Sequence, residues 1–443
     1  MLRVAVVGSG PSGVYTAQTL VQQDPAVLVD VLDRLPCPYG LVRYGVAPDH
    51  EKIKSLQSTL RTVLEHERIR FLGGVHVGAR GVPAARLREL YHAVVYCVGA
   101  ATDRRLGIPG EDLPGSWSAT RFVSWYSAHP DAVDAGFVRG ARSAVVIGVG
   151  NVAVDVTRIL ARGAAELSAT DMPQAALTAL AASEVTDVHM VGRRGPSQAR
   201  FTTKELRELG TLPGVEVRVD PAELALDPAY TDPSALPAVQ HRNVEVLRGW
   251  AGLPPGEAPR RIRLRFFLRP VALLPDGGRV GAARFERTVP DGRGGVTGTG
   301  RFEDIEAQLV LRSVGYRGVP VEGLPFDEAT GTVPNDAGRV APGVYVAGWI
   351  KRGPTGVIGS NRPCAKETVA SLLQDAPVLA LAAVPDDPLP ALRALSLTPV
   401  EWTGWRAIER AEAELGASLG RGVVKLPDWQ SLLTAAQGAE SGA

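Results

Sequence analysis

Short apolar runs alternate along the chain with longer stretches whose apolar residues recur at helical spacing. The runs rich in Val, Ile and Leu lie at residues 3–7, 28–32, 94–98, 143–147, 187–191, 261–268, 307–314 and 343–347. Helix-period stretches follow Ser12 and Asn151, and two more cover residues 202–209 and 355–373. Such apolar runs are typical of strands buried on both faces of a parallel sheet. The pattern therefore predicts the α/β class, with helices covering a parallel sheet.

Several segments interrupt this alternation. Gly and Pro dominate residues 251–259 and 288–300, which we expect to form loops or hairpin tips. Residues 164–184 exceed the length that a plain strand-helix-strand unit needs, so we expect an added helical excursion there. An Ala- and Pro-rich stretch at 376–390 precedes a last segment, 392–433, whose spacing predicts one or two helices that pack on the body as a cap.

A glycine-rich turn lies between the first predicted strand and the first predicted helix. It has the form G-x-G-x-x-G, with Gly8, Gly10 and Gly13 at the fixed positions. Gly8 allows the tight turn, Gly10 lets a pyrophosphate approach the backbone, and Gly13 lets the helix pack closely on the strand. Asp33 ends the next strand, at roughly the 20-residue distance where an acid accepts ribose hydroxyls. We interpret the turn as a dinucleotide site; a plain structural turn and a solvated acid are the alternatives.

A second turn of the same kind has Gly148, Gly150 and Ala153 at the fixed positions, again between a strand and a helix. Two nucleotide sites on one chain indicate two cofactors and electron movement between them. The strand that follows ends in Arg193 and Arg194 instead of an acid. Guanidinium groups match a phosphate with charge-assisted hydrogen bonds. The second nucleotide is therefore predicted to be NADP, the alternative being a solvated arginine pair.

Length, charge and cysteine content limit the classes of protein. At 443 residues the chain exceeds one hydrophobic core, which predicts two domains. Its 48 basic and 47 acidic residues argue against nucleic-acid binding. The cysteines, Cys37, Cys97 and Cys364, have no disulfide or metal-ligand spacing. No leader or membrane-spanning run stands out, because strand-like sequence begins at Leu2 and the late apolar run 376–384 is too short. We expect a cytoplasmic protein with neither metal nor membrane partner.

A further glycine-rich segment lies late in the chain. Gly348 and Trp349 follow a strand-like run, and Gly353 and Gly356 precede a predicted helix. The N-terminus of that helix would stabilise negative charge on the pyrimidine side of a reduced flavin. Taken alone, residues 353–356 are more often a plain helix start, and Trp349 is more often a core residue.

Taken together, the motifs resemble one family. The matching pieces are residues 8–13, 41–50 with Lys52 and Lys54, 148–155, 191–196, 201–208 and 348–359. In these pieces the chain is similar to the adrenodoxin reductase family, the FAD-containing ferredoxin–NADP reductases of the glutathione reductase-like superfamily, and especially to its bacterial members. Two departures are mild. Asp33 stands where many relatives have Glu, and Val149 where relatives usually have a polar residue. These departures affect the expected fine geometry of cofactor binding. They do not affect the expected reaction, because the motif residues at the ring are intact.

The resemblance implies two Rossmann-like dinucleotide-binding domains, the NADP domain being inserted into a discontinuous FAD domain. The expected bounds are 1–99 and 318–376 for FAD, 100–317 for NADP, and 377–443 for a C-terminal helical extension packed on the FAD domain. The implied FAD contacts are Gly8, Gly10, Pro11, Ser12, Gly13, Asp33, Leu41, Trp349, Gly356, Val357 and Ile358. The implied NADP contacts are Arg104, Gly148, Gly150, Asn151, Val152, Ala153, Arg193, Arg194, Glu205 and Gly356.

The resemblance also implies a reaction and a partner. Hydride would pass from NADPH to FAD, and single electrons would pass on to a ferredoxin-type iron-sulfur protein. No cluster-binding cysteine motif occurs in the sequence, so this partner is a separate chain. Hydride transfer needs no protein nucleophile, because the cofactors supply the chemistry. We expect His50 and Glu208 near the nicotinamide, with a buried structural histidine and a solvated helix acid as the alternatives, and a monomer or weak dimer in solution.

Three other functions share parts of this pattern. A disulfide reductase has the same two nucleotide sites but needs a C-x-x-C pair, which is missing. An electron-input subunit of a larger amidotransferase would have N-terminal cluster cysteines, also missing. A non-catalytic nucleotide sensor could keep both glycine-rich turns, and only the behaviour of a bound flavin would exclude it.

A docking surface is expected to be positively charged, because ferredoxins are usually acidic and this chain has a net charge of only +1. Arg200, Lys204 and Arg207 recur at helical spacing and would share one face of the 202–209 helix or its N-terminal approach. A solvated helix face is the alternative interpretation.

Overall fold

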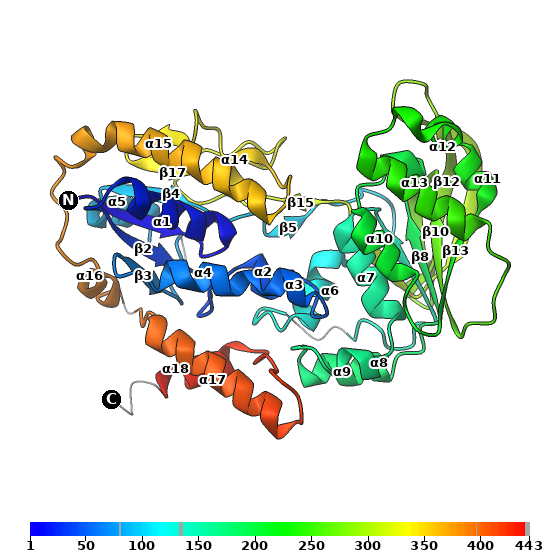
Figure 1. Cartoon of the computed structure of the whole chain (residues 1–443), viewed down its shortest axis with the longest axis horizontal. Coiled ribbons are helices and arrows are strands. Elements are labelled where there is room, and N and C mark those ends of the chain that lie inside the picture. Colours follow the sequence, from blue (N-terminus) through cyan, green and yellow to red (C-terminus); the bar gives the residue numbers. More distant parts are fainter. Residues whose placement is uncertain (79–80, 133–135, 396, 439–443) are drawn as a thin grey trace. The chain divides into compact units, whose positions relative to one another are not determined.

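The computed structural model describes residues 1–78, 81–132, 136–395 and 397–438, except the side chain of Thr231. The chain forms two compact units, coloured along the sequence in Figure 1. The first contains residues 1–102, 127–131 and 315–443, and the second contains residues 103–126 and 132–314. The second unit is thus inserted into the first, as the family resemblance implied.

The first unit is built on a six-stranded sheet in the order β16-β17-β4-β1-β2-β3. Its strands are β1 (Arg3–Val7), β2 (Leu28–Leu32), β3 (Ile69–Leu72), β4 (Ala93–Tyr96), β16 (Arg339–Ala341) and β17 (Val344–Val346). Neighbouring strands are parallel except β16, which runs antiparallel to β17. Alternate residues of β1 enter two different cores, Val4 and Val6 on one face and Ala5 and Val7 on the other.

Helices cover this sheet. They are α1 (Pro11–Gln23), α2 (Leu41–Tyr44), α3 (Glu51–Lys54), α4 (Leu56–Leu64), α5 (Ala84–Leu90), α14 (Trp349–Arg352), α15 (Asn361–Leu379), α16 (Leu389–Arg393), α17 (Trp402–Ser418) and α18 (Trp429–Gln437), with the 3₁₀ turn η3 (Ile358–Ser360). Among them, α1 and α15 pack against each other, as Figure 1 shows. The glycine-rich turn joins the carboxyl end of β1 to the start of α1, the arrangement that dinucleotides bind.

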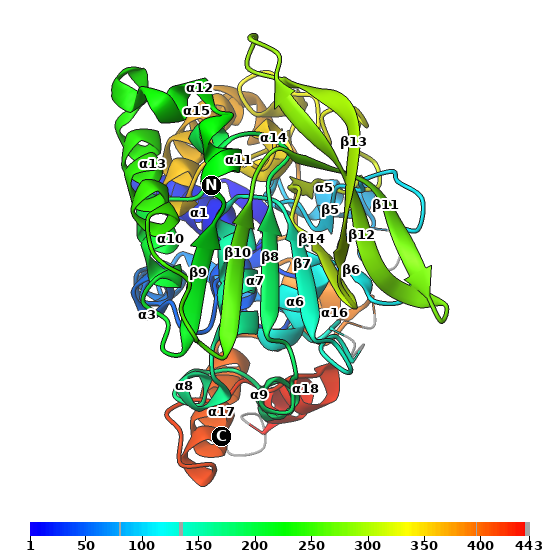
Figure 2. The same cartoon turned by 90° about the vertical axis from the view of Figure 1, so that its right-hand side faces the viewer.

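The second unit has three layers. Its six-stranded sheet has the order β6-β14-β7-β8-β10-β9, and every pairing is parallel. These strands are β6 (Ser116–Ser118), β7 (Ser143–Ile147), β8 (Asp187–Val191), β9 (Val215–Val219), β10 (Arg260–Arg265) and β14 (Leu309–Arg312). A three-stranded antiparallel sheet, β11 (Leu268–Asp276), β12 (Arg279–Pro290) and β13 (Val296–Glu306), lies beside it in Figure 2. Phe285 and Val145 share the core between the two sheets.

The helices of the second unit form its other layer. They are α6 (Ala119–Tyr126), α7 (Asn151–Ala161), α8 (Ala164–Leu167), α9 (Gln174–Ala181), α10 (Thr203–Leu209), α11 (Pro221–Ala225), α12 (Pro228–Thr231) and α13 (Ala238–Ala251), with the 3₁₀ turns η1 (Pro196–Gln198) and η2 (Pro233–Ala235). Two two-residue strands, β5 (Thr102–Asp103) and β15 (Tyr316–Arg317), pair where the chain passes from one unit to the other. No helix in the described part of the chain is long and apolar enough to cross a membrane.

The α/β prediction is confirmed, and α8 and α9 supply the expected excursion at 164–184. Three element predictions were wrong in part. The run at 261–268 is two strands, because a residue with positive φ, Phe267, separates β10 from β11. Strands β12 and β13 run through most of 288–300 despite its glycines, and only 291–295 forms the hairpin tip. The helix expected at 355–373 is preceded by η3 and begins at Asn361.

The C-terminal segment agrees with the expectation in part. The two helices α17 and α18 agree with the one or two expected in 392–433, and the short α16 precedes them. Residues 396 and 439–443 of the predicted extension lie outside the described residues. The predicted boundary at 376 falls inside α15, so helix and extension are continuous. Buried Trp405, Ile408 and Leu432 join the core of the first unit, which makes the segment part of that unit.

Candidate functional site

The first glycine-rich turn has room for a ligand only at Gly10. A Cβ on Gly8, which has φ +109°, would lie 2.5 Å from the Cys97 carbonyl oxygen, and one on Gly13 would lie 1.8 Å from the Gly8 carbonyl oxygen. A Cβ on Gly10 would meet only the Cα of Gly40, at 3.8 Å. Helix α1 starts directly after this residue with no side-chain cap, so its first N–H groups are available to an anion. The turn therefore fits a pyrophosphate.

Two polar groups of this turn bear on the predicted FAD contacts. The hydroxyl of Ser12 is buried and has no hydrogen-bond partner among the described residues, as a group awaiting a ligand would be. Asp33 accepts hydrogen bonds from the Ser9 amide (2.8 Å) and hydroxyl (2.5 Å). Burial raises the pKa of Asp33, and the bonds from Ser9 oppose that shift. Asp33 thus shapes the turn itself; its contact with a ribose stays a prediction, and Ser9 was not predicted from the sequence.

Two predicted flavin contacts, Leu41 on α2 and Val357 in the late glycine-rich segment, are apolar side chains at the surface of the first unit. Leu41 is 39% exposed and Val357 is 68% exposed, so both side chains are accessible to a bound ring. Trp349 lies with its ring centre 5.4 Å from that of Tyr316, and its indole N–H donates to the Thr355 carbonyl (3.2 Å).

The rest of the late motif is a turn built by glycine. Gly356 has φ +80°, and a Cβ there would lie 2.5 Å from the Ser360 hydroxyl. That hydroxyl accepts from the Val357 amide (3.2 Å), and Ile358 then opens η3 and packs on the core. The turn holds the exposed Val357 in place, which is what a ring-contacting side chain needs.

The second glycine-rich turn repeats this geometry in the second unit. Gly148 has φ +138°, and a Cβ there would lie 2.2 Å from the Ser313 carbonyl oxygen. A Cβ on Gly150 would meet nothing within 4 Å, so this residue faces open space at the start of α7. Ala153 is fully buried, as the close packing of helix on strand requires. Val152 is half-buried beside it. This turn also fits a pyrophosphate.

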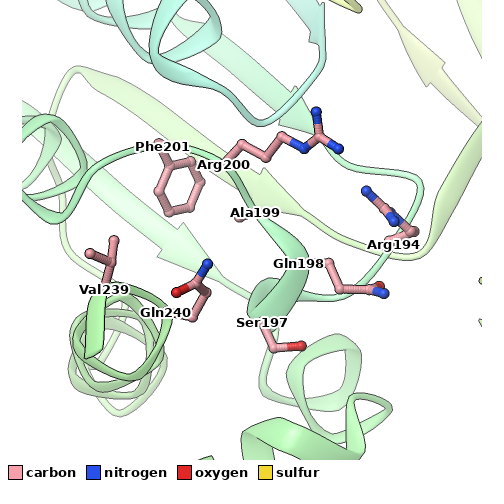
Figure 3. A pocket seen from close by; sticks show the side chains of 8 residues that line it. All are labelled: Arg194, Ser197, Gln198, Ala199, Arg200, Phe201, Val239 and Gln240. Carbon is pink, nitrogen blue, oxygen red and sulfur yellow. The ribbon is translucent and has the colours of Figure 1, made fainter. Parts of the chain in front are cut away.

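Three arginines, Arg193, Arg194 and Arg200, lie close to one another downstream of this turn. Within the described residues, Arg193, Arg194 and Arg200 form no ion pair. Burial and the charges of Arg193 and Arg200 lower the pKa of Arg194. A cavity of about 400 Å³ lies here, lined by Arg194, Ser197, Gln198, Ala199, Arg200, Phe201, Val239 and Gln240 (Figure 3). A phosphate dianion would remove the mutual repulsion of the guanidinium groups, so the cavity fits the 2′-phosphate of NADP.

Residues far away in sequence brace the arginine loop, and sequence reasoning missed them. The buried Thr288 hydroxyl, on β12, donates to the Arg193 carbonyl (2.9 Å). The buried Asp227 carboxylate accepts from the Ser197 amide (2.9 Å) and caps α12. Thr288 belongs to no local motif, and the Asp227-Pro228 sequence indicates only a helix N-cap, so no sequence signal connected either residue to the arginine loop.

The remaining predicted NADP contacts are placed as follows. Asn151 accepts from the Thr202 amide (2.8 Å), which ties the start of α7 to α10. On α10, Glu205 is buried, and its Oε2 has no hydrogen-bond partner among the described residues. A buried acceptor without a donor fits a ligand hydroxyl. Arg104 is exposed just after β5.

The two residues expected near the nicotinamide belong to different units. His50 is buried in the first unit, at the N-terminus of α3. Glu208 lies on α10 in the second unit and pairs with the buried Arg158 (3.1 Å) and with Lys204 (3.7 Å). Glu208 is therefore not simply a solvated helix acid, and its place at the nicotinamide stays a prediction.

The predicted docking residues lie at the surface of the second unit. Lys204 and Arg207 are exposed one helical turn apart on α10, and Arg200 is exposed three residues before this helix begins. All three side chains are therefore accessible, and their role as a docking surface stays a prediction.

Two strand-turn-helix sites in separate units, one followed by an arginine cluster, define the class of two-dinucleotide oxidoreductases. Residues 2–221 match the pyridine nucleotide-disulphide oxidoreductase family. The chain is 47% identical to NADPH-ferredoxin reductase FprA of Mycobacterium tuberculosis, over 84% of this chain and 83% of that protein. It is 39% identical to the mitochondrial NADPH:adrenodoxin oxidoreductase of Arabidopsis thaliana, over 98% and 95%.

A solved structure agrees with these sequence comparisons. The structure of Mycobacterium tuberculosis FprA in complex with NADPH superimposes with a TM-score of 0.94 at 44% identity, covering 99% of this chain and all of that one. The chain belongs to the family of NADPH-dependent ferredoxin and adrenodoxin reductases. The resemblance inferred from the motifs is thereby confirmed.

Proposed function

We propose that this protein is a ferredoxin–NADP reductase that binds FAD and NADP(H) and passes electrons to a separate iron-sulfur protein. The observation that carries this function is the pair of nucleotide turns in one chain, the second followed by Arg193, Arg194 and Arg200, which have no ion-pair partner among the described residues. The family's named members are NADPH-ferredoxin and NADPH:adrenodoxin reductases. We assign NADP to the second unit, because the arginine cluster follows its turn, and FAD to the first unit, whose turn is followed by Asp33 instead.

The protein's own contribution is to bind and orient. Bound FAD would accept a hydride and release electrons one at a time, which a one-electron cluster requires. The open backbone at Gly10 and Gly150 receives the two pyrophosphates, and the arginine cluster selects NADP over NAD. Glu205, with its free buried oxygen, is positioned to accept a ribose hydroxyl of NADP. His50 and Glu208 stay candidates for orienting the nicotinamide.

The proposal predicts colour and a specific acceptor. Purified protein should be yellow, and NADPH without oxygen should bleach it. Ferredoxins from the same genome should then be reduced with NADPH. A colourless protein, or a yellow one that NADPH leaves oxidised, would instead favour the nucleotide sensor. Bleaching with reduction of disulfides but of no ferredoxin would favour a disulfide reductase, which the three free, buried cysteines disfavour.

Compartment and assembly are proposals of the same kind. Three buried free thiols suit a reducing compartment, and we place the protein in the cytoplasm. We propose a monomer or weak dimer in solution, with neither nucleic acid nor membrane as a partner. Size-exclusion chromatography with light scattering would measure the molecular mass directly, and a stable larger assembly would refute this assignment.

Charge reversal on α10 tests the docking surface. Lys204→Glu with Arg207→Glu should lower ferredoxin-dependent turnover and remove much of its salt sensitivity, because these charges would no longer attract an acidic partner. Reduction of ferricyanide, which needs no docking, should change little. Arg301→Glu, an exposed arginine on β13, is the matched control. Equal losses with both acceptors would indicate damage to the NADP site, and no loss with either would leave these residues as ordinary surface.

A further inference from the structure

Three charged side chains are buried together beneath α2. Arg43, Glu412 and Lys425 are only 3%, 2% and 2% exposed. The Arg43 guanidinium pairs with the Glu412 carboxylate through two hydrogen bonds, of 2.5 and 3.1 Å. The Lys425 ammonium donates to the carbonyl oxygens of Arg43 (2.6 Å) and Ser127 (3.3 Å). The interior of the first unit thus contains two cations and one carboxylate. Arg43 comes from α2, Glu412 from α17, and Lys425 from the loop that follows α17.

A buried charge cluster of this kind adds little to the free energy of unfolding. Removing charges from water costs several kcal/mol per ion, and apolar residues of similar volume are often as stabilising as a buried ion pair. A bidentate pair and a lysine bound to a carbonyl oxygen do, however, fix the position of a backbone segment more narrowly than apolar packing does. The segment fixed here is α2, whose first residue, Leu41, is a predicted FAD contact.

Helix α2 rests directly on the first dinucleotide turn. Gly40 precedes α2 with φ +51°, and a Cβ there would lie 3.0 Å from the Cα of Gly10. The Tyr39 amide donates to the Ser9 carbonyl (3.1 Å). The two backbones are therefore in contact at the glycine where the pyrophosphate is expected. A shift of α2 would change both the shape of the turn and the position of Leu41.

The C-terminal segment contacts the chain on both sides of Gly40, at Tyr39 and at Arg43. On one side Glu412 holds Arg43, and on the other Trp405, also on α17, packs edge-on against Tyr39 with ring centres 5.8 Å apart. Trp405 also lies 5.0 Å from the Arg43 guanidinium.

Glu412 is itself fixed by the loop that follows α17. Its Oε1 accepts from the Leu426 amide (2.9 Å), and its carbonyl oxygen accepts from the Val424 amide (3.1 Å). A Cβ on Gly416 would lie 2.7 Å from the Gly422 carbonyl oxygen, so the loop folds back tightly on the helix. This fold-back places Lys425 under α2.

We propose that the C-terminal segment is a positioning element of the FAD site, in which Glu412 and Lys425 hold α2 against the dinucleotide turn. The inference rests on the proposed function, since it requires FAD at the first turn. A segment that served only as a cap on the core would stabilise the unit without affecting how tightly FAD is held. The two roles therefore differ in what their loss does to the cofactor of a protein that is still folded.

The test measures release of FAD from the purified holoenzyme. Lys425→Met removes the bonds to the carbonyl oxygens and leaves the ion pair whole. A second variant, Arg43→Met with Glu412→Leu, removes both members of the ion pair together and leaves Lys425 bonded to its carbonyl acceptors. Glu414→Gln, an exposed residue on the same helix, is the matched control. Protein is held at a temperature where circular dichroism shows native structure, and the bound flavin is followed by absorbance after rapid gel filtration.

Both test variants should release FAD about tenfold faster than the wild type, or be isolated without FAD, because α2 would no longer be held against the dinucleotide turn; a factor of ten corresponds to about 1.4 kcal/mol. The control should match the wild type. If either test variant, once natively folded, releases FAD within about twofold of the wild-type rate, the segment is only a cap and the proposal is wrong. A wild-type protein that carries no flavin would instead overturn the proposed function.

Discussion

Replacing Gly10 with valine is expected to give a folded protein that contains no FAD. Gly10 has an extended backbone conformation that valine adopts readily, and its Cβ would meet only the Cα of Gly40, at 3.8 Å. The protein itself therefore accepts a Cβ here. The added side chain would, however, occupy the place where the pyrophosphate approaches the backbone. The visible absorbance spectrum of the purified variant measures FAD occupancy, and circular dichroism verifies the fold.

The second turn supplies a reciprocal control. Gly150 also faces open space, so Gly150→Val should leave the chain folded. This variant should keep its FAD and lose NADPH binding, whereas Gly10→Val should lose FAD and still bind NADPH, as measured by nucleotide fluorescence. Full FAD occupancy in Gly10→Val would show that the flavin binds elsewhere. If Gly150→Val lost FAD instead, FAD would be assigned to the second turn and NADP to the first.

Changing Arg193 and Arg194 together to alanine is expected to raise the KM for NADPH about 10- to 100-fold. A charged hydrogen bond to a phosphate contributes about 1.5–3 kcal/mol, and each 1.4 kcal/mol corresponds to a factor of ten. The KM for NADH should hardly change, because NADH has no 2′-phosphate. Steady-state kinetics with both coenzymes, using ferricyanide as acceptor, gives the comparison.

Two results would separate this role from a structural one. Arg301→Ala removes an exposed arginine of the same unit and should change neither KM. If the double variant weakened NADH and NADPH equally, the arginines would support the loop and the phosphate assignment would be wrong. The absence of any carboxylate partner for Arg193, Arg194 and Arg200 among the described residues makes a purely structural role costly, since their charges repel one another.

The sequence alone determined the parts of this protein that local physics controls. Apolar runs predicted the parallel sheets, and the two turns at Gly8 and Gly148 were recognisable because only glycine fits where a Cβ would meet a carbonyl oxygen of a neighbouring segment. The choice of NADP followed from the residue type at the end of one strand, Arg193 and Arg194. Each turn lies within one strand-turn-helix unit, and the arginine pair follows the next strand of the second unit.

Tertiary structure alone decided everything that depends on contacts between distant segments. Helix α2 meets Glu412, which is 369 positions away from Arg43, and Thr288 reaches the Arg193 carbonyl across 95 positions. Residues 288–290 and 296–300 of the glycine-rich stretch form strand, because pairing of β12 with β13 and packing on the main sheet outweigh weak local strand preference. A buried charge such as Lys425 shows no partner in the sequence, since its acceptors are carbonyl oxygens that only the folded chain brings to it.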